Sequence, residues 1–212
     1  MKTIIFLNGD INDLVAAKKF FQPENFVIAV DGGARHCEAL SLIPNVIIGD
    51  LDSLSDAEVL HWDNKNVEII RHDPDKNDTD FELALLYAKD QAKDELIVFG
   101  ASGRRLDQVL ANFLLPAYEK LQGLNISFWV DGQTISLIKQ AKEIQAPIGT
   151  TVSLIPIGGR ATGVTTQGLV WPLSDESLAF GATRGVSNQM AVETARIRLK
   201  SGFLLCIVGS QD

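Results

Sequence analysis

Short apolar runs rich in β-branched residues recur along the first 130 residues, separated by longer stretches of mixed polarity. Each run has the length and composition of a buried strand, and the glycines and polar residues that follow are typical of turns. We therefore predict a mainly parallel sheet. Its six strands are expected at Ile4–Leu7, Phe26–Val30, Val46–Ile48, Val67–Ile70, Leu96–Phe99 and Ile126–Val130.

Helical periodicity fills several of the gaps between these runs. The clearest pattern runs from Asp80 to Ala92, where the apolar side chains form one stripe. Another runs from about Leu106 to Leu121, and Pro116 is expected to kink or interrupt it because proline lacks a backbone donor. Alternating strands and helices of this kind indicate βαβ units.

The pattern changes after about residue 131, where Gly, Thr, Ser and Pro separate short apolar runs. Residues 191–199 alternate in polarity, which predicts an antiparallel strand with one solvent-exposed face. We predict an α/β domain over residues 1–130, with a Rossmann-like sheet flanked by helices, and an all-β sandwich or barrel over 131–212. The strands of the second domain are expected at Thr134–Ile138, Thr151–Ile157, Ala191–Leu199 and Phe203–Val208.

Composition and charge narrow the function. The chain is 46% hydrophobic, and no apolar run reaches the roughly 18 residues that a membrane helix needs, so we expect a cytoplasmic protein that does not enter a membrane. Residues 1–122 carry 12 Lys and Arg against 21 Asp and Glu, a net charge of −9, whereas the remainder is close to neutral. This charge disfavours nucleic-acid binding and suits a metal ion or a cationic small molecule, although a solvated acidic surface explains it equally well.

Unusual residues collect where three predicted strands end. Asp31-Gly32-Gly33 follow the strand at 26–30, Gly49 through Ser53 follow the strand at 46–48, and Gly100 through Arg105 follow the strand at 96–99. In open α/β sheets, ligands bind beyond the carboxyl ends of the strands. One cleft is therefore expected to hold all three segments.

Asp50 and Asp52 are the most informative pair in this cleft. If the chain is still extended there, the two side chains point to the same side, because strand side chains alternate with period two. Two carboxylates placed together repel each other unless a cation lies between them. A hard divalent ion such as Mg²⁺, shared with substrate phosphates, fits that requirement.

Glycine and arginine at the strand ends have two interpretations each. Gly32 and Gly33 let backbone amides approach a phosphate, although paired glycines more often mark a tight turn. Gly103 shares this ambiguity, but Arg104 and Arg105 follow it, and guanidinium groups bind phosphate oxygens in bidentate fashion.

Two further acidic positions lie near helix starts. One of residues 77–79 is expected to be the N-cap of the helix that follows, and acids in the first turn of a helix complement its dipole. Capping explains one polar residue of the segment 76–80 more easily than all five of them. Asp107 either complements the dipole of its helix or orients Arg105 or a metal-bound water.

Several motifs in fixed order resemble the thiamine pyrophosphokinase family, whose members transfer a pyrophosphoryl group from ATP to thiamine. The resemblance spans nearly the whole chain. It rests on Asp31–Ala34, Pro44–Ser53, Asn77–Phe81, Gly100–Asn112, Ser153–Pro156, Thr165–Leu173 and Gly185–Asn188.

The resemblance implies an N-terminal catalytic domain that binds ATP and Mg²⁺, a β-sandwich that binds thiamine, and a homodimer with active sites shared between subunits. As metal ligands it implies Asp31, Asp50, Asp52 and Asp80, and Arg105 and Asp107 join Asp50, Asp52 and Asp80 as catalytic residues. The implied substrate-binding residues are Asp31, Gly32, Gly33, Asp78, Thr79, Gly103, Trp171, Ser187 and Asn188. Trp171 precedes a proline, which favours an exposed ring able to stack on the thiamine cation.

The chain departs from the family pattern at Asn77, Arg104 and Gln108, and Arg35-His36 replace a frequent Asn-x pair. Two other functions use the same residue types. One is an ATP-dependent small-molecule kinase that transfers a single phosphoryl group, and the other is a nucleotide- or thiamine-binding sensor without activity.

Overall fold

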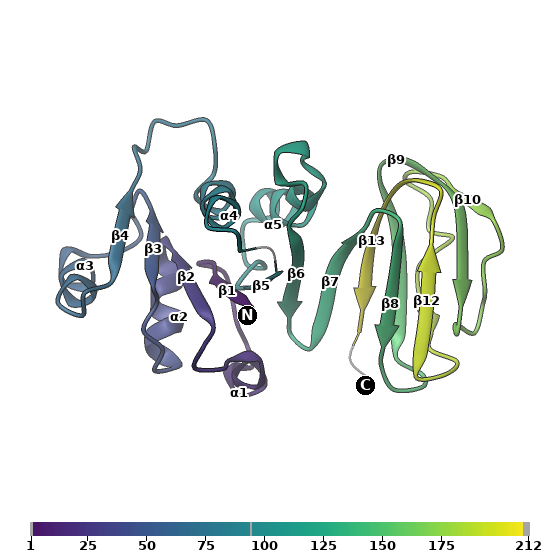
Figure 1. Ribbon diagram of the computed structural model, residues 1–212, viewed down its shortest axis with the longest axis horizontal. Coiled ribbons are helices and arrows are strands. Elements are labelled where there is room, and N and C mark those ends of the chain that lie inside the picture. The colour runs from purple at the N-terminus through teal and green to yellow at the C-terminus, as the bar shows by residue number, and fades with distance from the viewer. Residues whose placement is uncertain (1, 94, 210–212) are drawn as a thin grey trace. The chain divides into compact units, whose positions relative to one another are not determined.

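The computed structural model describes residues 2–93 and 95–209, which form two compact units (Figure 1). The first unit ends at Asp131 and the second begins at Gly132. Within the described residues, every helix is too short or too polar to cross a bilayer.

The first unit alternates strands with helices, and mixed α/β class is thereby confirmed. Its strands are β1 Thr3–Phe6, β2 Phe26–Val30, β3 Val46–Gly49, β4 Glu68–Arg71, β5 Glu95–Phe99 and β6 Asn125–Val130. Its helices are α1 Leu14–Ala17, α2 Ala34–Ala39, α3 Asp56–Asp63, α4 Asp80–Asp90 and α5 Leu106–Leu114, with 3₁₀ turns η1 Lys18–Phe20, η2 Asp31–Gly33, η3 Leu115–Ala117 and η4 Glu119–Leu121.

The six strands pair in the order β4-β3-β2-β1-β5-β6, and every pairing is parallel. The chain adds strands on one side of β1 up to β4 and then on the other side, so β1 marks the point where the order reverses (Figure 1). In such sheets the crevice at the carboxyl ends near the reversal is the usual ligand site. The ends of β1, β2 and β5 meet there.

Helices cover both faces of this sheet. On one face Phe6 and Ile47 pack with Cys37 of α2 and Trp62 of α3 in one buried cluster. Phe128 lies next to Trp129, a member of that cluster, and therefore points to the opposite face because side chains alternate along a strand.

On that opposite face, the rings of Phe81 in α4 and Phe113 in α5 pack on Phe128 at centroid distances of 6.1 and 5.2 Å. The buried residues of α4 recur at helical spacing, which is the stripe that its sequence predicts. Burial of both sheet faces explains why the strands are apolar runs without alternation.

The six predicted strands are confirmed, with ends that shift by at most one residue. The predicted helix at 80–92 is α4, and it ends at Asp90. The helix predicted over 106–121 ends at Leu114, where two 3₁₀ turns take over and Pro116 occupies the first of them. Helix α3 was not predicted, because its eight residues lack an apolar stripe.

The second unit is built from antiparallel strands, and its described part contains no helix. The strands are β7 Gln133–Ile138, β8 Ala141–Gln145, β9 Thr151–Gln167, β10 Glu176–Leu178, β11 Asn188–Gln189, β12 Thr194–Arg198 and β13 Ser201–Val208. The 17-residue β9 pairs with β13 through its first half and with β12 near its end, so it joins two groups of strands.

A buried cluster fills the second unit and includes Leu154 and Val164 of β9, Ile197 of β12 and Leu204 of β13. The alternation predicted for 191–199 is confirmed in β12, where Ala195 and Ile197 are buried and the arginines are exposed. The predicted strand was too long, because residues 191–193 bend before the pairing with β8 begins. The polar strands β8, β10 and β11 were not predicted.

Candidate active site

Three carboxylates meet at the carboxyl edge of the parallel sheet. Asp31 follows β2, Asp50 follows β3, and Asp80 is the first residue of α4. One oxygen atom of each lies within 4.8 Å of the other two, and all three side chains are half-buried. The strand-end argument predicts the meeting of Asp31 and Asp50, and the start of α4 adds Asp80 to them.

The turn after β3 brings Asp50 towards Asp31. Gly49 has a φ of +153°, and a Cβ atom there would lie 1.8 Å from Asp31 Oδ1, so only glycine allows this approach. The backbone N–H of Leu51 donates to the same Asp31 oxygen at 3.0 Å. The backbone of the Asp50 turn is therefore attached directly to the Asp31 carboxylate.

The extended geometry considered for Asp50 and Asp52 is wrong. Leu51 adopts a left-handed φ of +66°, and its side chain is buried, which turns the chain between the two acids. Asp50 is half-buried and accepts the N–H of Asp52 at 3.0 Å, whereas the Asp52 side chain is exposed. Asp52 therefore lies beside the three-acid cluster and outside it.

Burial and neighbouring negative charges raise the pKa of two acids at this edge, Asp31 and Asp52. Burial raises the pKa of Asp31 to about 7, with further increases from Asp80 and Asp50 and an opposing decrease from the Leu51 N–H. The negative charge of Asp50 raises the pKa of Asp52. Clustered acids of this kind are typical of functional sites.

The donor set fits a hard divalent cation. Mg²⁺ binds oxygen ligands at about 2.0–2.1 Å in octahedral geometry, so opposite ligands lie about 4.2 Å apart. Oxygens within 4.8 Å of one another need only small side-chain movements to reach that spacing. A bound cation would also lower the pKa of Asp31, because its positive charge opposes the effects of burial and of the neighbouring carboxylates.

Neighbouring residues hold Asp80 in place. The side-chain oxygen of Thr79 accepts the backbone N–H of Glu82 at 3.2 Å and caps α4, which identifies Thr79 as the N-cap among residues 77–79. Lys76 Nζ donates to Asp80 Oδ1 at 2.5 Å, and both side chains are largely buried. Asp78 is half-buried and raises the pKa of Glu82, a smaller effect than the burial of that residue.

The paired glycines are required by close packing. A Cβ atom on Gly32 would lie 2.1 Å from the Asn8 side chain, and one on Gly33 would lie 2.1 Å from the Phe6 carbonyl oxygen. The Gly32 N–H donates to Ser53 Oγ at 2.9 Å. This turn therefore brings the ends of β1, β2 and β3 together.

The loop after β5 presents a charged pair. Arg105 donates to Asp107 through Nε at 3.1 Å and through a terminal nitrogen at 2.5 Å. Both side chains are about two-thirds exposed. Arg105 lowers the pKa of Asp107 to about 2. Asp107 therefore orients Arg105, as one of the two interpretations predicts. Gly103 lies in the same loop, and a Cβ atom there would lie no closer than 3.6 Å to another atom, so packing does not require a glycine at this position.

The second unit has a pocket of its own, with a volume of about 180 Å³. Its lining includes Trp171, Arg184, Val186 and Asn188. The backbone N–H of Trp171 donates to Asn188 Oδ1 at 3.1 Å, and Asn188 Nδ2 donates to the Trp171 carbonyl oxygen at 2.7 Å. These reciprocal bonds join the two predicted thiamine-binding elements.

Trp171 is 56% exposed, in agreement with the turn that Pro172 predicts. Ser187 has a left-handed φ of +61°, and its N–H donates to Ser153 Oγ at 3.0 Å. Arg184, which sequence reasoning missed as a lining residue, forms an ion pair with Glu176 at 3.2 Å. The one available signal was its position next to Gly185.

A parallel sheet with a carboxylate cluster at its carboxyl edge, joined in one chain to an antiparallel β unit, defines an α/β protein suited to hold a phosphate ligand with a divalent cation. The chain belongs to the thiamin pyrophosphokinase family. Residues 17–128 match the family model "Thiamin pyrophosphokinase, catalytic domain", and residues 132–204 match "Thiamin pyrophosphokinase, vitamin B1 binding domain".

Curated relatives agree with this assignment. The thiamine pyrophosphokinase of Bacillus subtilis (strain 168) is 26% identical over 219 aligned residues, covering 98% of both chains. Thiamine pyrophosphokinase 1 of Oryza sativa subsp. japonica is 26% identical over 175 residues, covering 77% of this chain. That match spans 66% of the rice protein, just under two thirds of its length.

Solved structures share the fold. A crystal structure of thiamine pyrophosphokinase from Bacillus subtilis has a TM-score of 0.89, with 22% identity and full coverage of both chains. A crystal structure of thiamin pyrophosphokinase from Geobacillus thermodenitrificans has a TM-score of 0.87, with 23% identity and coverage of 100% of this chain and 99% of that one. The order of strands and helices is therefore that of the family.

Proposed function

We propose that the chain is a thiamine pyrophosphokinase, which transfers the pyrophosphoryl group of ATP to the hydroxyl of thiamine and gives thiamine diphosphate and AMP. The observation that carries the proposal is the cluster of Asp31, Asp50 and Asp80 at the sheet edge of a chain that matches both family models. The comparisons favour this reading over a single-phosphoryl kinase or a sensor.

We propose a division of labour between the two parts of the chain. Residues 1–130 form a Rossmann-like catalytic domain that binds ATP, and residues 131–212 form a β-sandwich that binds thiamine. The matched catalytic and vitamin B1 binding models, which cover residues 17–128 and 132–204, support this division.

The charged cluster suits the first substrate. Asp31, Asp50 and Asp80 would hold Mg²⁺, which would neutralise the triphosphate charge and fix its geometry. The exposed Asp52 lies close enough to Asp50 for its pKa to respond, and we propose that it binds a water of the metal. Lys76 limits the negative charge at Asp80.

Transfer requires positioning and charge stabilisation more than covalent chemistry. Arg105 would stabilise the charge that develops on the transferred group, and Asp107 keeps its guanidinium oriented. Gly32, Gly33 and Gly103, with Asp78 and Thr79, would shape the cleft around the nucleotide. The thiamine hydroxyl would attack the β-phosphorus and pass its proton to a carboxylate of the site or to water, while the bond from the β-phosphorus to the α–β bridging oxygen breaks and AMP departs with that oxygen.

The pocket of the second unit suits the second substrate. An indole face beside a cation gains roughly 0.5 to 2 kcal/mol, depending on desolvation. We propose that Trp171 stacks on the cationic thiazolium, and that Ser187 and Asn188 fix the loop that presents it.

One incubation tests the reaction. The full chain is mixed with thiamine, ATP and Mg²⁺, and the products are identified by mass. Thiamine diphosphate and AMP in equal amounts over many turnovers are expected. Thiamine monophosphate with ADP would indicate a single-phosphoryl kinase, and binding without turnover would indicate a sensor.

Three further expectations from the sequence stay predictions. They are assembly into a homodimer with shared active sites, a cytoplasmic location and the lack of nucleic-acid binding. Sedimentation of the purified chain tests the first of them directly.

A further inference from the structure

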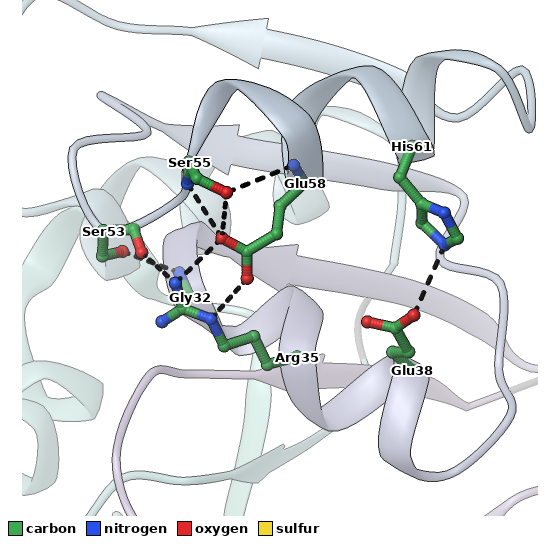
Figure 2. Close-up of polar contacts among 7 residues, drawn as sticks. All are labelled: Gly32, Arg35, Glu38, Ser53, Ser55, Glu58 and His61. Carbon is green, nitrogen blue, oxygen red and sulfur yellow. Dashed lines mark hydrogen bonds and ion pairs between the residues drawn. The ribbon is translucent and has the colours of Figure 1, made fainter.

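Arg35 of α2 and Glu58 of α3 form a two-pronged ion pair between the helices that follow the Asp31 and Asp50 turns (Figure 2). Arg35 Nε donates to Glu58 Oε1 at 2.6 Å, and a terminal nitrogen donates to Glu58 Oε2 at 3.1 Å. Paired hydrogen bonds of this type fix the relative orientation of both groups. They join the start of one helix to the first turn of the next.

The same arginine also holds the loop that carries Asp50 and Asp52. Its terminal nitrogen donates to the carbonyl oxygen of Ser53 at 2.6 Å, while the N–H of Gly32 donates to Ser53 Oγ at 2.9 Å. Both donors belong to the segment that follows Asp31. Ser53 is therefore bound at two atoms, one residue after Asp52 (Figure 2).

Glu58 is itself fixed in place. Its Oε2 accepts the backbone N–H of Ser55 at 2.8 Å and the Ser55 hydroxyl at 2.7 Å, and its own N–H donates to Ser55 Oγ, which completes a capping box. Arg35 lowers the pKa of Glu58 to about 2, so the carboxylate stays charged at neutral pH. The second half of the loop 50–55 is thereby anchored at Ser53 and at Ser55.

We propose that Arg35 and Glu58 are positioning residues for the metal site, a role that rests on the proposed function. They hold the loop 50–55 against the β2–α2 turn, so that the carboxylates of Asp31 and Asp50 converge on one cation. Neither side chain needs to touch the cation or a substrate. Because half of the Arg35 side chain is exposed to solvent, loss of the pair is expected to affect the geometry of the site more than the stability of the fold.

Arginine is required here because of its shape. A lysine keeps the positive charge but has one nitrogen, which cannot reach both Glu58 oxygens and the Ser53 carbonyl in fixed geometry. Arg35→Lys therefore removes the clamp at constant charge. Glu58→Gln removes the charge of its partner and keeps an oxygen acceptor for Ser55.

A matched control lies between the same two helices. His61 of α3 lies 3.6 Å from Glu38 of α2, and this pair is remote from the loop 50–55 (Figure 2). Glu38→Gln removes a contact between α2 and α3 without touching Ser53. A purely structural effect of weaker helix contacts would affect this variant as well.

The test measures Mn²⁺ binding to the full chain by electron paramagnetic resonance, without nucleotide, and then the Mg²⁺ dependence of turnover. Arg35→Lys and Glu58→Gln are expected to bind Mn²⁺ about tenfold more weakly and to need about tenfold more Mg²⁺ for half-maximal rate, as for other groups that orient metal ligands. Saturating Mg²⁺ is expected to restore most of the turnover. Glu38→Gln is expected to match the wild type.

Unchanged Mn²⁺ affinity in both clamp variants, or an equal loss in Glu38→Gln, would overturn the proposal. Melting temperatures identify any variant that does not fold. In that case Ser53→Ala, which removes one anchored atom and leaves the ion pair, is expected to weaken Mn²⁺ binding, and unchanged binding would again overturn it. If the wild type makes no thiamine diphosphate yet the Mn²⁺ differences appear, the proposed function fails and the clamp stands.

Discussion

Asp31 illustrates how one residue gains an unusual environment from its neighbours. It is half-buried, its Oδ1 accepts the Leu51 N–H, and two other carboxylates lie within 4.8 Å. Burial and these charges raise its pKa to about 7. The folded chain therefore retains a proton on Asp31 at a pH where the unfolded chain has released it.

This difference predicts how stability changes with pH in the absence of metal. Between about pH 4 and pH 7 the folded state binds more protons than the unfolded state, so the contribution of Asp31 to stability falls as the pH rises. Asp31→Asn does not titrate and keeps an oxygen acceptor for Leu51. Its melting temperature minus that of the wild type, measured in chelator, is expected to increase from pH 5 to pH 8.

Asp63→Asn provides the control for the loss of one carboxylate, because Asp63 is exposed at the end of α3 and lies outside the acid cluster. A pH-independent difference for Asp31→Asn would contradict the raised pKa.

Helix α4 illustrates how an element delivers a functional residue. Thr79 has an extended backbone, caps the helix and is followed at once by Asp80, so the helix start fixes the third carboxylate. Phe81 and the rest of the buried stripe attach the helix to the sheet. Capping and function therefore involve adjacent residues rather than competing for the same one.

We predict that Thr79→Ala lowers the free energy of unfolding by about 1 kcal/mol, since the N–H of Glu82 loses its acceptor. Urea denaturation measures this change. Thr79→Ser keeps the hydroxyl and is expected to stay close to the wild type. Equal stability of the alanine variant would show that the cap contributes nothing.

Elements could be predicted from the sequence where burial leaves a clear pattern. Most strands of the first unit are buried on two faces and are apolar runs, and α4 is buried on one face and shows an apolar stripe. Helix α3 carries no such stripe, and its one signal, Ser55-x-x-Glu58, is the capping box. The short polar strands of the second unit depend on long-range pairing with β9, which no local pattern encodes.

The site could be predicted only in part. Strand-end position predicted that Asp31 and Asp50 lie together, whereas Asp80 starts a helix and was expected there only from the family resemblance. The exclusion of Asp52 follows from the left-handed backbone at Leu51, and a leucine gives no signal for that conformation. The Arg35 contacts to Ser53 and Glu58 depend on how two helices and a loop pack.

At the scale of the whole molecule, the two units have separate chemistry. The first unit carries the acid cluster, and the second carries a pocket lined by Trp171 with a nearly neutral sequence around it. The proposed division of binding between the two units predicts that a variant in the second unit changes the KM for thiamine and not the KM for ATP.

Trp171→Ala is therefore expected to raise the KM for thiamine roughly 2- to 30-fold, the equivalent of the cation–π gain, and to leave the KM for ATP unchanged. Steady-state kinetics with each substrate varied in turn measure this. Val192→Ala, an exposed apolar position in the same unit, is the control. An unchanged KM for thiamine would contradict the stacking role.

The central claim is that the carboxylate cluster holds the cation that makes ATP a pyrophosphoryl donor to thiamine. The most direct test compares AMP and thiamine diphosphate formation by the wild type and Asp50→Asn, with and without Mg²⁺, after circular dichroism has confirmed that both are folded. Equal amounts of both products are expected from the wild type with Mg²⁺ only, and none from Asp50→Asn. Wild-type turnover by a folded Asp50→Asn chain, or by the wild type in chelator, would contradict it.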